Sequence, residues 1–326
     1  MFAARGVAVS FSVFMMVYCV LSLAVRFSWR AAWLHSRRHP VRRTADLLFA
    51  VRLFPLAVAA AVTAAFTVPS FLLLEPRAID EPMGYVPLML GICGAGLGIF
   101  GIVNAGVALR RASRTISRWT KAAQPVESCA SVPVLRISPV TGEGNIAEIT
   151  VPAMTAAGIV RPRVLLSGVA ESMLTASELR TALNHEVAHV RRRDNLKKLL
   201  LWFVAFPGMA GLEAAWLEAT EMAADDAAVL NSSEALDLAA ALIKLSRLVR
   251  LEPPADLTAA LVHSPAAVMN ARVQRLIAWS DERLASPPGF FPWYGLGAAC
   301  ATVAVFAVTY GHLLARVHTA TEWLVR

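Results

Sequence analysis

Four apolar runs in this chain are each long enough to cross a lipid bilayer as a helix. They cover residues 7–25, 53–74, 84–109 and about 291–317. A helix needs about 20 apolar residues to span roughly 30 Å of hydrocarbon. The composition agrees with membrane insertion, because hydrophobic residues make up 57% of the chain and charged residues only 17%. The runs therefore predict an α-helical membrane protein with four spans.

Basic residues are distributed unevenly around these runs, and their placement predicts the orientation. Arginines crowd the connection between the first and second spans, and a second basic group, from Arg110 to Lys121, follows the third. Cytoplasmic loops of membrane proteins carry an excess of Lys and Arg. We therefore expect the chain to lie in the lipid bilayer of the bacterial cytoplasmic membrane, with both termini outside. This placement accounts for the net charge of +8, so we expect no direct binding of nucleic acid.

The spans divide the chain into three parts. Residues 1–109 hold three spans with a basic cytoplasmic loop, residues 110–288 form one cytoplasmic domain, and residues 289–326 hold the fourth span with a short outer tail. Within the middle part, the apolar stretch 199–217 is interrupted by a proline and two glycines. We expect this stretch to lie against the membrane rather than to cross it.

The pattern of the cytoplasmic domain predicts an α+β fold in which helices dominate. We expect strands at 132–137 and 159–166, the second at a sheet edge because it contains a proline. Thr175 and Glu178 form a capping-box pattern, which begins a helix that continues to about residue 194. Further helices are expected at 212–230, 234–250 and 266–278.

The segment His185-Glu186-Val187-Ala188-His189 lies in the middle of the capped helix. Residues four apart share a helix face, so both imidazoles can reach one ion. Neutral imidazole is a zinc ligand, and a neighbouring carboxylate can act as a general base on a water molecule. The four cysteines form no Cys-x-x-Cys pair, so a metal must be held by His and carboxylates. We expect a Zn²⁺ site with His185 and His189 as ligands and Glu186 as the base.

A catalytic zinc needs a third ligand from the protein. Glu218, Glu221 and Asp225 occupy helical positions i, i+3 and i+7, which share a face. Glu221 is the best candidate for the ligand, and Asp225 then orients a ligand imidazole by accepting its hydrogen bond. Spacing alone leaves open the alternative that this acidic stripe is a solvated helix face.

The sequence around these residues resembles the signature of the BlaR/MecR family of membrane gluzincins. The resemblance rests on residues 183–196, on residues 158–166 and on the pattern Glu221-x-x-Ala-Asp225, and it covers roughly residues 151–228. It implies a zincin-like metallopeptidase domain in which His185, His189 and Glu221 bind zinc and Glu186 is the general base. It also implies that the strand at 159–166 pairs with substrate backbone.

The resemblance further implies a regulatory peptidase that acts as an antirepressor in signal transduction. Its partner would be a cytoplasmic protein substrate, a transcriptional repressor of the BlaI/MecI type. Self-cleavage and a homodimer are left open. The β-lactam sensors of this family carry a penicillin-binding domain after the fourth span, whereas only a short tail follows that span here. We therefore do not expect direct acylation by β-lactams.

Two other functions remain open. One is a quality-control protease like HtpX, which uses the same zinc chemistry on membrane proteins. Such enzymes usually have two hydrophobic spans between the histidine pair and the third ligand, where this chain has one interrupted stretch. The other is a non-catalytic signalling scaffold stabilised by zinc. Glu186 speaks against the scaffold, because a structural zinc site has no use for a base.

A donor that stabilises the oxyanion is harder to identify. All four tyrosines lie in or beside the expected spans, which leaves His263, Arg272 and Arg275 as candidates. Among these we assign His263 to the catalytic residues as a hypothesis, which a His263→Ala variant would test.

Overall fold

Three long helices form one end of the molecule. The computed structural model describes residues 2–36, 40–75, 84–121, 123–126, 131–137, 152–204, 206–247, 258–260, 266–279 and 309–322. Helix α1 covers Phe2–Ser36, helix α2 covers Val41–Val62, and helix α4 covers Tyr85–Thr120. Helix α2 continues through a π-helical turn, Thr63–Thr67, into α3, Val68–Leu74. The turn precedes Pro69, whose ring cannot continue the regular hydrogen-bond ladder.

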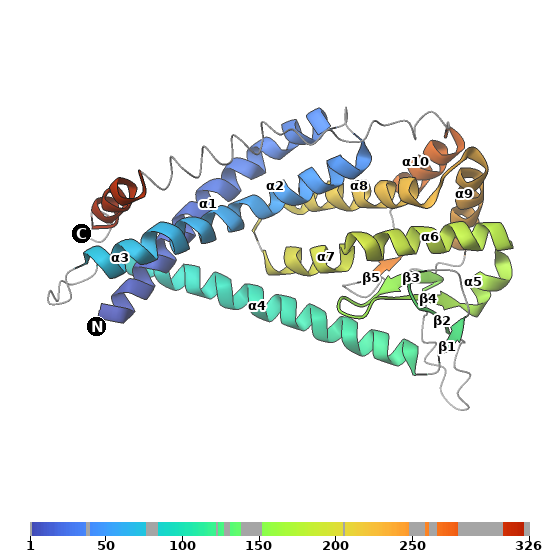
Figure 1. Ribbon diagram of the computed structural model, residues 1–326, viewed down its shortest axis with the longest axis horizontal. Coiled ribbons are helices and arrows are strands. Elements are labelled where there is room, and N and C mark those ends of the chain that lie inside the picture. Colours follow the sequence, from blue (N-terminus) through green and yellow to red (C-terminus); the bar gives the residue numbers. More distant parts are fainter. Residues whose placement is uncertain are drawn as a thin grey trace.

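Within the described residues, three helical stretches are long and apolar enough to cross a membrane, namely Phe2–Ala31, Val41–Leu74 and Tyr85–Thr120. The first three expected spans are therefore confirmed as apolar helices. The fourth, at 291–317, lies mostly outside the described residues, which begin again at 309 with a helix to 322. That helix lies beside α3 (Figure 1), and the hydroxyl of Tyr310 donates to the carbonyl of Ala65 in the π-helical turn at 2.5 Å.

Helices α1 and α4 approach each other closely at two glycines. A Cβ on Gly91 would lie 2.8 Å from the carbonyl oxygen of Ala8, and one on Gly94 would lie 2.5 Å from that of Phe11. Contacts this short exclude any side chain. The hydroxyl of Ser12, at the same crossing, donates to the carbonyls of Ala8 and Pro87. The glycine-rich stretch therefore works as small residues do between membrane helices, by letting backbones touch.

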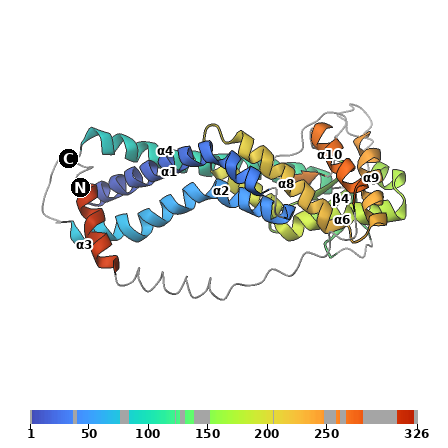
Figure 2. The same ribbon diagram turned by 90° about the horizontal axis from the view of Figure 1, so that it is seen from above.

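An α+β domain forms the other end of the molecule (Figure 2). Among the described residues its sheet has the order β1-β2-β4-β3-β5, in which the β2–β4 pair is parallel and the other three pairs are antiparallel. The strands are β1 (Gln124–Val126), β2 (Val134–Ile137), β3 (Met154–Ala157), β4 (Arg163–Ser167) and β5 (Thr258–Ala260). Its helices are α5 (Gly168–Met173), α6 (Ala176–Arg192), α7 (Asp194–Phe203), α8 (Ala210–Ala228), α9 (Ser232–Ser246) and α10 (Ala266–Ile277). The expected α+β class with dominant helices is observed.

One expectation about the sheet is wrong. The strand expected at 159–166 is β4, which begins at Arg163 and pairs with β2 on one side and β3 on the other. Pro162 does not force an edge position, because it stands just before the strand, after a bend at 159–161 that follows Gly158, a glycine with a φ of +92°. Since both sides of β4 are occupied, this strand cannot pair with substrate backbone.

The apolar stretch 199–217 is divided between two helices rather than forming one span. Helix α7 ends at Phe203, α8 begins at Ala210, and a turn with Gly208 at a φ of +85° joins them. Helix α7 packs against α4, and α8 packs along α2 (Figure 1). Leu212 and Trp216 are buried against Ala45 and Leu48 of α2. The stretch therefore ties the α+β domain to the long helices.

Candidate metal centre

The helix α6 carries both histidines of the motif and is fixed at its start. Thr175 Oγ1 accepts from the amide of Glu178 at 3.3 Å, and Glu178 Oε2 accepts from the amide of Thr175 at 2.8 Å. Lys244 of α9 also binds the Glu178 carboxylate at 2.7 Å. The capping box expected from the sequence is therefore present, and a cation from a neighbouring helix reinforces it. Its effect is to fix the register in which the motif faces the interior.

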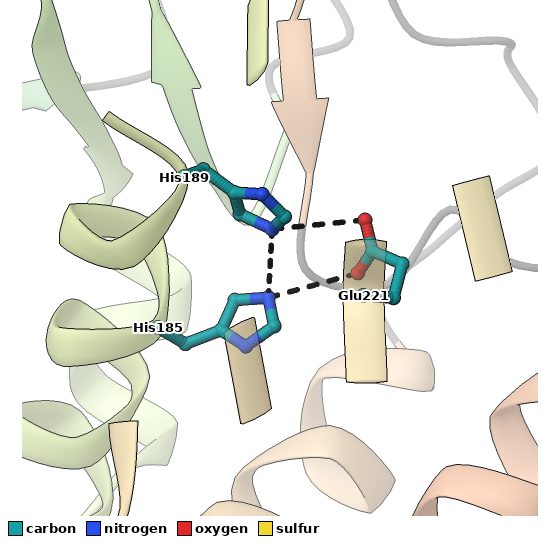
Figure 3. A group of neighbouring side chains, drawn as sticks. All are labelled: His185, His189 and Glu221. Carbon is teal, nitrogen blue, oxygen red and sulfur yellow. Dashed lines mark hydrogen bonds and ion pairs between the residues drawn. The ribbon is translucent and has the colours of Figure 1, made fainter. Parts of the chain in front are cut away.

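His185, His189 and Glu221 lie together, with their ligand atoms facing one another (Figure 3). The two Nε2 atoms are 3.1 Å apart. Glu221 Oε2 lies 3.6 Å from Nε2 of His185, and Oε1 lies 3.6 Å from Nε2 of His189. The histidines come from α6 and the carboxylate from α8, which pack against each other. The structure thus brings together the three residues that the sequence proposed as ligands.

The spacing of these atoms fits a zinc ion. Zinc binds imidazole nitrogen and carboxylate oxygen at about 2.0–2.1 Å in tetrahedral sites, so neighbouring ligand atoms lie about 3.3–3.4 Å apart. The three separations here, 3.1, 3.6 and 3.6 Å, bracket that value. Two imidazoles and one carboxylate would leave the fourth tetrahedral position open, as a catalytic zinc site requires. Both donor type and spacing therefore suit Zn²⁺.

Each histidine is backed by a buried carboxylate at its other ring nitrogen. Asp225 Oδ1 lies 2.9 Å from Nδ1 of His185, which is the contact expected of Asp225 from the sequence. Asp194 Oδ2 lies 2.8 Å from Nδ1 of His189. Such a carboxylate fixes the tautomer that presents Nε2 to the metal and strengthens the imidazole as a ligand. Asp194 was not predicted in this role.

The position of Asp194 depends on a backbone feature that spacing alone does not reveal. Asp194 is the first residue of α7, and Arg193, which separates α6 from α7, has a left-handed backbone with a φ of 55°. This kink turns the chain so that Asp194 comes back beside His189. An acidic residue five positions after the second histidine was the only available signal.

Arg272 of α10 is fully buried and joins the two carboxylates of α8. Its Nε and Nη2 donate to Asp225 at 2.8 and 2.7 Å, and its Nη1 lies 3.0 Å from Glu221. These contacts raise the pKa of Arg272 above its ordinary value, although burial opposes the charge. The structure therefore gives Arg272 a part in holding Glu221 and Asp225, in place of the oxyanion role considered from the sequence. Arg275 instead pairs with Asp226.

Glu186 is fully buried and has one oxygen fixed and one without a partner. Its Oε2 accepts a hydrogen bond from the amide of Ala156 in β3 at 2.5 Å. Its Oε1 has no hydrogen-bond partner among the described residues. Burial raises the pKa of Glu186, and this effect outweighs the neighbouring histidines, which lower it. A buried carboxylate with a free oxygen and a raised pKa has the chemistry of a general base.

The charges of the site favour a protonated imidazole until a metal binds. Burial alone would lower the pKa of His185, but Asp225 and Glu221 raise it to about 9. For the Glu221 carboxyl, burial alone would raise the pKa, but the charges of His189 and Arg272 hold it at about 2. A zinc ion would supply the positive charge between these groups that a proton otherwise provides.

Two of the sequence candidates are not brought into this group. Glu218 of α8 is not one of the three residues whose ligand atoms converge. His263, expected as a catalytic residue, lies outside the described residues. Its assignment stays a prediction.

Comparison with known proteins agrees with the geometry. The model of the family described as BlaR1 peptidase M56 matches residues 86–274, which is more than half of the chain. The match runs from α4 through the histidine motif and Glu221 into α10. No curated protein matches the chain. The chain belongs to the BlaR1 peptidase M56 family.

Proposed function

We propose that this protein is a zinc endopeptidase of the bacterial cytoplasmic membrane that cleaves a cytoplasmic protein. The observation that carries the proposal is the convergence of two Nε2 atoms and one carboxylate, together with buried Glu186, which interacts electrostatically with all three residues and whose Oε1 has no hydrogen-bond partner among the described residues. Two imidazoles and one carboxylate could also hold a structural zinc. A buried base next to the ligands is what a hydrolase needs and a scaffold does not.

His185, His189 and Glu221 would hold the zinc ion. When bound, zinc would polarise the peptide carbonyl and lower the pKa of the attacking water. Glu186 would take the proton from that water on Oε1 and deliver it to the leaving amine. The amide of Ala156 would keep the carboxylate oriented during both transfers. Asp225 and Asp194 would hold the two imidazoles by their Nδ1 atoms.

The sheet also suggests how a substrate chain would lie near the base. Strand β3 supplies the amide that binds Glu186, and its outer side is lined by β5, which runs antiparallel to it. Because β3 is paired with β4 and β5, the strand next to it with an outer side left among the described strands is β5. We propose that substrate backbone pairs with the outer side of β5, in place of the β4 position expected from the sequence.

The proposed substrate is a transcriptional repressor of the BlaI/MecI type in a signalling pathway. The basic connections support a cytoplasmic placement of the α+β domain, where such a repressor would be found. Membership of the BlaR1 peptidase family supports a regulatory rather than a general protease. The helices α1, α2–α3 and α4 would hold the enzyme in the membrane.

The test compares cells that express the native protein with cells that express Glu186→Gln. A Glu218→Gln variant serves as the matched control, because it makes the same chemical change at a carboxylate outside the converging group. Proteomes are searched for fragments, and transcripts for induced genes. One cleaved DNA-binding protein, intact only with Glu186→Gln, is the expected result. Fragments from many membrane proteins would instead identify a quality-control protease. If the strains did not differ, the proposed peptidase function would be overturned.

A further inference from the structure

The long helix α2 contacts the α+β domain through a charged residue at its end nearest that domain. Asp46 of α2 accepts a hydrogen bond from Nζ of Lys197 at 3.1 Å and lies 3.9 Å from Nη2 of Arg192. Lys197 belongs to α7 and Arg192 to the end of α6. The Lys197 ammonium also lies 5.6 Å from the ring centroid of Phe49, another residue of α2. Helix α2 therefore binds the chain on both sides of the α6–α7 kink.

The same two basic residues contact the carboxylate that backs a candidate metal ligand. Nε of Arg192 lies 3.5 Å from Oδ2 of Asp194, and Nζ of Lys197 lies 3.8 Å from Oδ1. Asp194 is fully buried, whereas the side chain of Asp46 is 54% exposed. Arg192 and Lys197 are thus shared between an outer carboxylate on α2 and an inner carboxylate beside His189.

A second ion pair holds α2 in register with the domain. Nε of Arg52 lies 2.9 Å from Oε1 of Glu213 on α8, and Nη2 donates to the carbonyl of Val204. Arg52 is 2% exposed. Because Asp46 and Arg52 lie on one rigid helix, the Arg52 contacts fix the position along the axis of α2 at which Asp46 contacts Lys197 and Arg192.

We infer that Asp46 is a positioning residue for the metal centre, acting on His189 through Lys197, Arg192 and Asp194. The inference rests on the proposed function and deepens it, because it names the residue by which a membrane helix influences the site. Asp46 takes part of the positive charge that would otherwise act on Asp194. Without Asp46, both cations act on Asp194 alone and weaken it as an acceptor for Nδ1 of His189. A poorer acceptor makes the imidazole a weaker zinc ligand.

Movement of α2 would act in the same way as loss of Asp46. One helical turn along the axis is about 5.4 Å, which is enough to break a contact of 3.1 Å. A signal that shifts α2 within the membrane would therefore change the metal site without touching it. Helix α2 is coupled to the α+β domain through two contacts, one at Asp46 and one at Arg52.

The test measures the zinc affinity of the full chain in detergent, by competition with a chelator, for Asp46→Asn. Arg43→Gln is the matched control, since Arg43 is an exposed residue of the same helix. We expect Asp46→Asn to lower the affinity roughly three- to tenfold, less than the 10- to 100-fold typical of residues that touch a ligand directly. The affinity of Arg43→Gln should equal that of the native protein, and Asp46→Glu should restore most of the loss. Equal affinities for Asp46→Asn and Arg43→Gln would overturn the inference.

A double-mutant cycle with Asp194→Asn tests the route. If Asp46 acts through Asp194, Asp46→Asn adds little to the loss caused by Asp194→Asn alone. Independent, additive losses would show that Asp46 acts elsewhere and would also overturn the inference. Helix content from circular dichroism verifies that each variant is folded. Zinc affinity does not depend on a substrate, so a failure of the proposed peptidase function would be seen separately, as absent cleavage with the zinc results unchanged.

Discussion

His189 and Asp194 lie on consecutive helices, and the kink at Arg193 brings Nδ1 of the histidine to 2.8 Å from Oδ2 of the aspartate. This contact makes the α6–α7 junction part of the metal centre. An Asp194→Asn variant should bind zinc 10- to 100-fold more weakly, because Asn is a poorer acceptor for the imidazole proton. Chelator competition measures the change. An unchanged affinity would mean that the carboxylate does not support the ligand.

Removal of the proposed base should separate catalysis from metal binding. Glu186→Gln should lower kcat by about 10²- to 10⁴-fold, the range of general acid–base catalysis, while zinc affinity stays within a few-fold of the native value. The reason is that Glu186 interacts electrostatically with His185, His189 and Glu221 without being one of these three converging ligands. Peptide cleavage and bound zinc are measured on the same preparation. Loss of zinc together with activity would instead assign Glu186 to the metal.

Arg272 should contribute most to the stability of the fold when no metal is bound. Arg272→Met leaves Glu221 and Asp225 buried without their shared cation, and breaking a buried pair on one side costs about 3–5 kcal/mol. We expect a lower melting temperature in chelator and a partial recovery when zinc is added. Arg275→Met is the comparison, since Arg275 binds Asp226 at a partly exposed position. Equal losses in the two variants would contradict a special role for Arg272.

Zinc affinity should depend on pH through His185. Its pKa in the metal-free site is raised to about 9, so zinc must displace one proton at neutral pH. Affinity should rise about tenfold per pH unit up to about pH 9 and then level off. The raised pKa also means that charged His185 stabilises the metal-free protein. This contribution is complete below the unfolded value of 6.5 and is lost as the pH rises through about 9.

Proton release on zinc binding, measured in weakly buffered solution, tests the same point. About one proton per zinc is expected at neutral pH. A release near zero would show that His185 is already neutral there.

The α1–α4 crossing should be sensitive to a single methyl group. Gly94→Ala would place a Cβ 2.5 Å from the carbonyl of Phe11, so the helices must separate and the melting temperature in detergent should fall. Gly96→Ala, two residues on, meets no atom within 4 Å and should leave the melting temperature unchanged or slightly higher. A fall of the same size in both variants would indicate a general effect on α4.

The sequence by itself determined the features that depend on local spacing. Apolar runs of sufficient length predicted the three described helices that are long and apolar enough to cross a membrane, and the capping box at Thr175 predicted where α6 begins. The i, i+4 spacing placed His185 and His189 on one face. Glu221 and Asp225 followed from a second helical stripe, and all four residues meet in the structure.

Only the tertiary structure decided the features that depend on where distant elements meet. The left-handed Arg193 places Asp194 beside His189, and α10 brings Arg272 between Glu221 and Asp225. Strand β4 can lie inside the sheet because Pro162 stands before its first hydrogen-bonded residue, Arg163. The sequence pattern could not show where the strand begins. Asp46 meets Lys197 across about 150 residues of chain only because α2 packs along the domain. Local patterns fix helices and faces, whereas partner choice between elements is set by packing.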